Sequence, residues 1–184
     1  YIWYNIRSQL RRMIEIIDDY LSQTDADHIE RLFLKDYSLP WFIADGMTYF
    51  DENSNPLRYE TKILYHHFYR SQNHTSQFLK YITSAFEFDY KKCLNIRANL
   101  TMSNRFDLRH SRYHTDWENY ENYKTYIYYV NGFNTPTILK TGLLTRKLVF
   151  PKKNRMLIFD GNIKHANYIP FFKERCVINF NFKN

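Results

Sequence analysis

The chain is organised around the stretch Tyr113-His114-Thr115-Asp116-Trp117. Side chains two residues apart in an extended strand point to the same face, so His114 and Asp116 are placed to reach one metal ion together. A polar loop separates this stretch from Thr125-Tyr126-Ile127-Tyr128-Tyr129-Val130-Asn131, which is β-branched and aromatic and ends at an Asn-Gly turn. We therefore expect an imidazole and a carboxylate side by side just before a strand.

Short strand candidates fill the rest of the second half of the chain. They lie at residues 93–102, 136–140, 145–150, 155–160 and 175–182. Turn-forming Gly142, Pro151 and Gly161 separate the later ones. Short strands at this spacing are typical of an antiparallel sandwich or barrel.

The first half of the sequence is predicted to form mostly helices. Apolar residues at helical spacing predict helices from 5 to about 14, from 22 or 24 to about 35, and for about 13 residues from 73 or 75. Residues 16–21 and 57–69 are strand candidates instead. The length of 184 residues suits one well-cored domain. We expect a single α+β domain, 1–184, with helical N-terminal support in about residues 1–90 and an all-β core in about residues 93–184.

Composition restricts the class of protein. No apolar run is long enough to cross a membrane and the first residues do not resemble a signal peptide; because Tyr1 is not Met, we expect the true start to be missing or processed. Cys93 and Cys176 lie outside any CxxC spacing, which predicts two core thiols in a reducing, cytoplasmic compartment. The net charge of +7 permits a nucleic-acid partner but does not indicate one, because Lys and Arg are dispersed along the chain.

Two residues further along complete a possible site. His165 follows the strand candidate at 155–160 and its turn. Two imidazoles and one carboxylate on one side of an ion, with the other side open, are the arrangement of non-haem Fe(II) oxygenases. Arg175 opens the last strand candidate, whose alternation puts Val177, Asn179 and Asn181 on its own face. A buried guanidinium needs a carboxylate partner, and a dicarboxylate cosubstrate would provide one.

From about Cys93 to Phe182 the sequence resembles the 2-oxoglutarate- and Fe(II)-dependent oxygenases, and among them the prolyl-4-hydroxylase-like branch. The resemblance rests on His114-Thr-Asp116, Tyr126–Asn131, Pro151 with Asn154–Asp160, His165 and Arg175–Asn179. The sequence is most similar to small members encoded by bacteriophages, in which a stretch like Arg97-Ala98-Asn99-Leu100 precedes the His-x-Asp motif.

The resemblance implies a double-stranded β-helix, or jelly roll, flanked by N-terminal helices. It implies that His114, Asp116 and His165 ligate Fe(II). It also implies that Arg175 pairs with the distal carboxylate of 2-oxoglutarate and that Tyr129 adds its hydroxyl to the same group.

Three further pocket candidates follow from the same resemblance, of which Asn99 and Thr137 are the weaker ones. Asn179 matches a position that lines the cosubstrate pocket, and Asn99 and Thr137 are further candidates. The Gly-Gly-x-Thr motif common in this branch is replaced here by Asn134-Thr-Pro-Thr137, a departure that leaves the role of Thr137 open.

The implied reaction consumes 2-oxoglutarate and O2, releases succinate and CO2, and hydroxylates a substrate C–H bond, with ascorbate as a supporting reductant. Asp116 favours hydroxylation, because related halogenases lack this carboxylate. A peptidyl proline is the first candidate substrate; other peptides or proteins, free amino acids, small metabolites and nucleobases stay open. The expected location is the cytoplasm, of the host if the protein is phage-encoded, with no membrane partner.

Two alternatives keep the fold but change the function. One is a non-catalytic jelly-roll module that binds nucleic acid or sugar through its basic, aromatic surface. The other is a cupin-like metalloenzyme that does not use 2-oxoglutarate. Pairing of Arg175 with a dicarboxylate separates the second alternative from the oxygenase.

Overall fold

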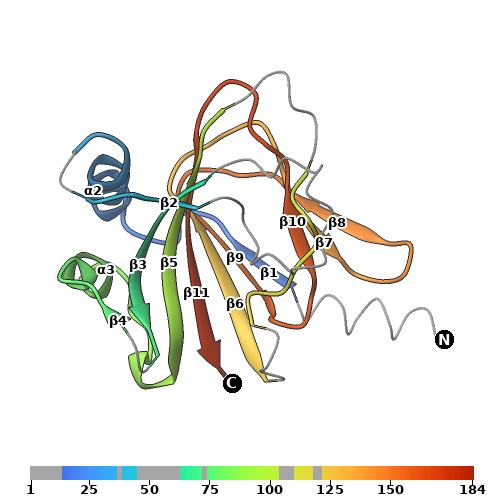
Figure 1. Ribbon diagram of the computed structural model, residues 1–184, viewed down its shortest axis with the longest axis horizontal. Helices are drawn as coiled ribbons and strands as arrows, with labels where there is room; N and C mark the ends of the chain where they lie inside the picture. The colour runs from blue at the N-terminus through green and yellow to red at the C-terminus, as the bar shows by residue number, and fades with distance from the viewer. Residues whose placement is uncertain (1–13, 37–38, 45–62, 72–73, 104–109, 118–121) are drawn as a thin grey trace.

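The computed structural model describes residues 14–36, 39–44, 63–71, 74–103, 110–117 and 122–184. Within these ranges the chain forms two antiparallel sheets that face each other (Figure 1). The larger sheet has eight strands in the order β1-β9-β6-β11-β5-β3-β2, with β4 paired to β3, and the smaller has the order β10-β7-β8.

The strands of the larger sheet are β1 (Ile14–Ile17), β2 (Phe42–Ala44), β3 (Ile63–Arg70), β4 (His74–Thr75), β5 (Cys93–Thr101), β6 (Tyr123–Tyr129), β9 (Arg155–Asp160) and β11 (Arg175–Lys183). Those of the smaller sheet are β7 (Thr137–Lys140), β8 (Arg146–Val149) and β10 (His165–Asn167). The strands expected in the second half of the sequence are therefore confirmed, with ends shifted by a few residues.

The connection between the sheets is that of a jelly roll. Isolated bridges join His110 to Tyr168 and His114 to His165, so the segment 110–114 runs beside β10 as a further edge of the smaller sheet. From β5 onward the chain therefore passes between the larger and the smaller sheet, ending with β11 between β5 and β6. This arrangement is the predicted double-stranded β-helix.

The helices are fewer and shorter than predicted. α2 (Gln23–Leu34) forms as expected, because Ser22 caps it by accepting a hydrogen bond from the Asp25 amide. α3 (Leu79–Thr83) has five residues instead of about 13, and a short 3-10 turn, η1 (Tyr90–Lys92), follows. The chain leaves the helix after Thr83 and packs the Phe86 and Phe88 rings on the sheet, so tertiary packing overrides the helical spacing. The helix expected at 5–14 falls almost wholly outside the described residues.

The N-terminal part also differs from the expected helical support, because it supplies strands to the larger sheet. β3 pairs with β5 from Ile63 to Arg70, and β1 pairs with β9. Added strands cover the edges of the jelly roll, which would otherwise expose unpaired backbone groups. The boundary expected near residue 90 is therefore not a boundary between helices and strands. No helix among the described residues is long and apolar enough to cross a membrane.

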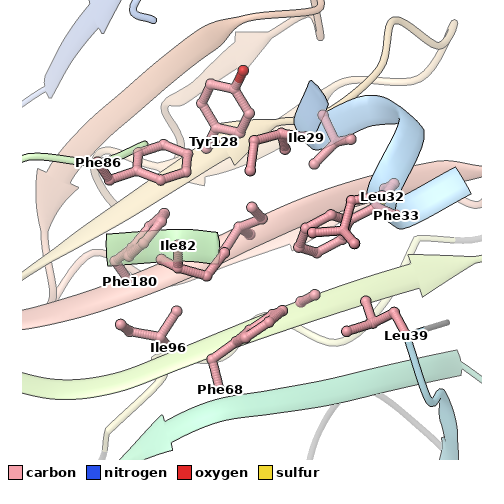
Figure 2. Packing of buried hydrophobic residues seen from close by; sticks show 14 of the residues in the cluster. Ile29, Leu32, Phe33, Leu39, Phe68, Ile82, Phe86, Ile96, Tyr128 and Phe180 are labelled. Carbon is pink, nitrogen blue, oxygen red and sulfur yellow. The ribbon is translucent and has the colours of Figure 1, made fainter. Parts of the chain in front are cut away.

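The larger sheet has a core on each of its faces. α2 and α3 lie on the face that is turned away from the smaller sheet (Figure 1). Figure 2 shows this core, with Ile29, Leu32 and Phe33 of α2 and Ile82 of α3 over Phe68, Ile96, Tyr128 and Phe180 of the strands. The second core lies between the two sheets and includes Ile127, Tyr129, Leu139, Leu157 and Val177.

Alternation along β11 divides its side chains between these two cores. Cys176, Ile178, Phe180 and Phe182 pack toward the helices. The other set, Arg175, Val177, Asn179 and Asn181, faces the smaller sheet. Below, the side of the larger sheet that faces the smaller one is called the inner face.

Candidate metal centre and buried arginine

His114, Asp116 and His165 converge at one point between the two sheets. Each offers a ligand atom, and these atoms all lie within 4.8 Å of one another. Asp116 Oδ1 is 3.9 Å from His114 Nε2 and 3.6 Å from His165 Nε2. The three side chains are thus close enough for one ion to contact all of them after small rotations.

Backbone pairing brings the two histidines together. The His114 and His165 amides each donate to the other residue's carbonyl, at 3.0 and 2.9 Å. Directly opposed residues of an antiparallel pair present their side chains on the same side, and the two rings lie 4.5 Å apart. Asp116 follows His114 at a bend rather than within a strand, so the chain turns to bring its carboxylate to the rings.

Contacts of the two imidazole rings bear on their ability to bind a metal. His114 Nδ1 lies 3.0 Å from the Arg112 carbonyl, which can only accept, so Nδ1 carries a proton and Nε2 is the nitrogen that faces Asp116. Burial, followed by the neighbouring His114, lowers the pKa of His165 to about 4. Its imidazole is therefore neutral at neutral pH.

Tyr123 joins the two loops that carry the ligands. Its hydroxyl accepts a hydrogen bond from the Trp117 amide at 3.1 Å and donates to the Gly161 carbonyl at 2.9 Å. The ring lies so close to Gly161 that a Cβ there would meet ring atoms at 2.2–2.5 Å. Glycine is therefore required at this turn because the aromatic ring occupies the space of a side chain. Tyr123 holds the turn after Asp116 against the turn before His165.

Asn181 is a site residue to which the sequence analysis assigned no role. Its amide nitrogen donates to Asp116 Oδ2 at 2.9 Å and to Thr125 Oγ1 at 3.0 Å. The alternation from Arg175 placed Asn181 on the inner face, and that was the only signal for it. The partner, Asp116, is 65 residues away, a contact that periodicity does not reveal.

Arg175 is a charged residue buried on the inner face. Its side chain is only 3 % exposed, and its guanidinium has no carboxylate within 4.0 Å among the described residues. Its neighbours are the Phe133 ring at 5.4 Å and Thr137 Oγ1 at 3.5 Å, and Nε has no hydrogen-bond partner. Burial lowers the pKa of Arg175 to about 10, so the group still carries its charge at neutral pH. A buried cation with no counter-ion among the described residues makes this position a candidate site for an anionic ligand.

Tyr129 and Thr137 lie beside this guanidinium. The Tyr129 hydroxyl donates to Thr137 Oγ1 at 2.8 Å, and the Thr137 hydroxyl lies between the tyrosine and Arg175. Burial raises the pKa of the Tyr129 phenol, so it stays protonated and able to donate. The structure therefore brings Arg175, Tyr129 and Thr137 together, although Thr137 belongs to the stretch that departs from the family motif.

Asn99 and Asn179 lie on the same inner face, between the arginine and the triad along the sheet. Asn99 is directly opposite Val177, and Asn179 is opposite Arg97 on β5 and Ile127 on β6. The Oδ1 atoms of both asparagines are buried and have no hydrogen-bond partner within the described part of the chain. Leaving such acceptors unpaired costs about 1–3 kcal/mol each, so this strip is expected to face water or a polar ligand.

Comparison with known proteins identifies solved structures that share this fold. No protein-family model matches the sequence, and no curated protein matches it. Among solved structures, an oxidoreductase of the 2OG-Fe(II) oxygenase family from Burkholderia pseudomallei is similar with a TM-score of 0.67 and 10 % identity, over 98 % of this chain and 90 % of the other.

Two prolyl hydroxylases are similar as well. The enzyme from Trichoplax adhaerens, in complex with a hypoxia inducible factor peptide fragment, has a TM-score of 0.63 at 14 % identity and covers 99 % of this chain and 91 % of the other. A prolyl-4-hydroxylase from Pseudomonas putida has a TM-score of 0.57 at 11 % identity, with full coverage of both chains. At such low identity the comparison establishes the fold: the chain has the double-stranded β-helix that these 2-oxoglutarate-dependent oxygenases share.

Proposed function

We propose that this protein is an Fe(II)- and 2-oxoglutarate-dependent oxygenase that hydroxylates a C–H bond of its substrate and releases succinate and CO2. The observation that carries the proposal is the buried guanidinium of Arg175, which has no carboxylate partner among the described residues, on the face of the larger sheet toward which the His-Asp-His cluster is turned. A triad alone would also suit other metalloenzymes, whereas the combination requires both a divalent ion and an acidic ligand.

His114, Asp116 and His165 would hold Fe(II) through two imidazole nitrogens and one carboxylate oxygen. The bound iron supplies the oxygen chemistry, which no side chain of the protein can perform by itself. The Arg112 carbonyl keeps His114 in the tautomer that offers Nε2, and Tyr123 keeps the two ligand loops together.

Arg175 would bind the distal carboxylate of 2-oxoglutarate, with Thr137 and Tyr129 supplying hydroxyl groups beside it. In this role the dicarboxylate offsets the charge that the protein buries. Apolar side chains such as Val177 and Leu139 line the space between the sheets and exclude water from the ion pair. Asn179 and Asn99 are polar residues that lie along the sheet between Arg175 and the metal ligands, and we assign them to the cosubstrate pocket.

The substrate we place first is a peptidyl proline, within a single oxygenase domain that acts in the cytoplasm with ascorbate as a supporting reductant. Support comes from the similarity in fold to prolyl hydroxylases, one of which was solved with a peptide. Free amino acids, small metabolites and nucleobases are the other classes to include in a screen for succinate release.

The proposal is tested with the purified protein and anaerobic Fe(II). Wild-type protein is expected to bind 2-oxoglutarate and, on admission of O2, to release succinate slowly even without substrate. Asp116→Ala should abolish succinate release, because one of the three ligands is lost. The exposed Asp19→Ala is the matched control and should behave as wild type.

Absence of both 2-oxoglutarate binding and succinate release in the wild-type protein would refute the oxygenase. Tight binding of a divalent ion without any 2-oxoglutarate binding would point to the 2-oxoglutarate-independent metalloenzyme instead.

A further inference from the structure

The amide of Asn181 makes two hydrogen bonds inside the larger sheet. The residue is completely buried on β11, a central strand between β5 and β6. Nδ2 uses both of its hydrogens, one toward Asp116 Oδ2 and one toward Thr125 Oγ1. Thr125 is the directly opposed residue on β6 and is also fully buried, so the amide is held on a rigid part of the fold.

The orientation of this amide follows from the chemistry of its partner. An ionised carboxylate only accepts hydrogen bonds, so the nitrogen of Asn181 must face Asp116 and the oxygen must point away. That oxygen, Oδ1, is indeed buried and has no hydrogen-bond partner among the residues that the structure describes. The protein therefore retains an unsatisfied acceptor, at a cost of about 1–3 kcal/mol, in order to present a donor to Asp116.

The two oxygens of Asp116 thereby have different roles. Oδ2 is held by Asn181. Oδ1 is the atom that faces Nε2 of both histidines, at 3.9 and 3.6 Å. A carboxylate without such an anchor can rotate and offer both oxygens to the same ion.

We propose that Asn181 is a positioning residue that restricts Asp116 to binding the metal through Oδ1 alone. This inference rests on the proposed function in one respect: single-oxygen binding keeps free a metal position that a chelating 2-oxo acid and O2 require. Thr125 acts one step further out, because its hydroxyl fixes the amide that fixes the carboxylate. None of these contacts includes the substrate, so the role is independent of substrate identity.

Co(II) binding to the apoprotein, measured by calorimetric titration, tests whether Asn181 positions Asp116 for metal binding. Asn181→Leu keeps the branched shape of the side chain and removes the donor, and it is expected to weaken Co(II) binding by about 10- to 100-fold. Thr125→Val should weaken it by about two- to tenfold, because the amide loses one hydrogen bond but stays in place. Asn95→Leu is the matched control, since Asn95 is directly opposite Asn181 on β5 and makes no hydrogen bond to Asp116 among the described residues.

Binding of 2-oxoglutarate to protein saturated with Co(II) tests whether single-oxygen binding by Asp116 keeps a metal position free for the cosubstrate. Asn181→Leu should bind both ligands less tightly. Arg175→Met should lose 2-oxoglutarate binding and keep its Co(II) affinity, because its side chain does not contact Asp116. Urea unfolding of the metal-free variants separates these effects from a general loss of stability.

Each outcome decides one question. Wild-type Co(II) affinity in Asn181→Leu overturns the inference, and so does an equal loss in Asn95→Leu, because the effect then does not depend on the bond to Asp116. If Asn181→Leu does not fold, Thr125→Val decides, and unchanged affinity there overturns the inference. A wild-type protein that binds Co(II) but no 2-oxoglutarate refutes the proposed function while the metal test of Asn181 remains valid.

Discussion

Replacing Arg175 by Met should stabilise the apoprotein and strongly weaken 2-oxoglutarate binding at the same time. Arg175 is 3 % exposed, and no carboxylate of the described residues lies within 4.0 Å of its guanidinium. Its pKa is lowered to about 10 by burial, a change worth on the order of 3 kcal/mol of destabilisation of the folded, charged form at neutral pH. Loss of the contact with the Phe133 ring offsets about 1 kcal/mol of the gain.

The net gain is therefore about 2 kcal/mol, or a rise of about 4–8 °C in the melting temperature for a domain of this size. Met retains most of the aliphatic volume, so little is lost in packing. The effect on the ligand has the opposite sign. Removing one member of a buried, hydrogen-bonded charge pair costs about 2–5 kcal/mol, which weakens 2-oxoglutarate binding by about 30- to 5,000-fold.

Two measurements are needed: thermal unfolding of the metal-free protein followed by circular dichroism, and calorimetric titration of 2-oxoglutarate into Co(II)-loaded protein. Arg155→Met is the matched control, because Arg155 lies on β9 directly opposite Tyr129 of β6 but is paired with Asp18 at 2.6 and 3.0 Å. The control should lose a little stability, about 1 kcal/mol or less, and bind 2-oxoglutarate normally. A less stable Arg175→Met that binds 2-oxoglutarate as wild type would refute the reasoning.

Three further predictions concern the surroundings of the site. Gly161→Ala places a methyl group against the Tyr123 ring and should cost about 1–3 kcal/mol in urea unfolding, with weaker Co(II) binding; unchanged unfolding would show that the ring can move aside. Tyr129→Phe removes the hydrogen bond to Thr137 and should weaken 2-oxoglutarate binding by about tenfold in the same titration, whereas equal affinity would place the phenol outside the cosubstrate pocket. The apoprotein should lose stability as the pH falls from 6.5 toward 4, because the pKa of His165 is lowered in the folded protein. Over this range the unfolded chain takes up a proton on His165 that the native protein does not. Urea-unfolding midpoints that do not change over this range would contradict the prediction.

Much of the site could be predicted because its residues lie in locally regular patterns. Period-two alternation along residues 175–182 put Arg175 and Asn179 on one face, and the structure has both on the inner face of β11. The turn at Gly161 separated β9 from His165, so a second histidine on a neighbouring strand was a reasonable expectation. His114 and His165 are in fact directly opposed.

The prediction was weakest where distant parts of the chain decide the outcome. The number of residues in α3 depended on how Phe86 and Phe88 pack on the sheet, which helical spacing does not encode. The strand candidate at 57–69 carried no information about its neighbour, and only the fold pairs β3 with β5.

By itself, the sequence determined which residues alternate toward one face, and hence most strands of the sheets, while the members of the candidate triad followed from the His-x-Asp motif and the family resemblance. Alternation is a property of the backbone and needs only local information. Tertiary structure decided the contacts between strands: Asn181 with Asp116, and Thr137 between Tyr129 and Arg175. These contacts depend on strand register and on the closure of loops that are tens of residues long. They form only when the two sheets pack against each other and bury their facing side chains. For the same reason, His114-Thr115-Asp116 becomes a candidate metal centre only when β10 brings His165 to it and β11 brings Asn181.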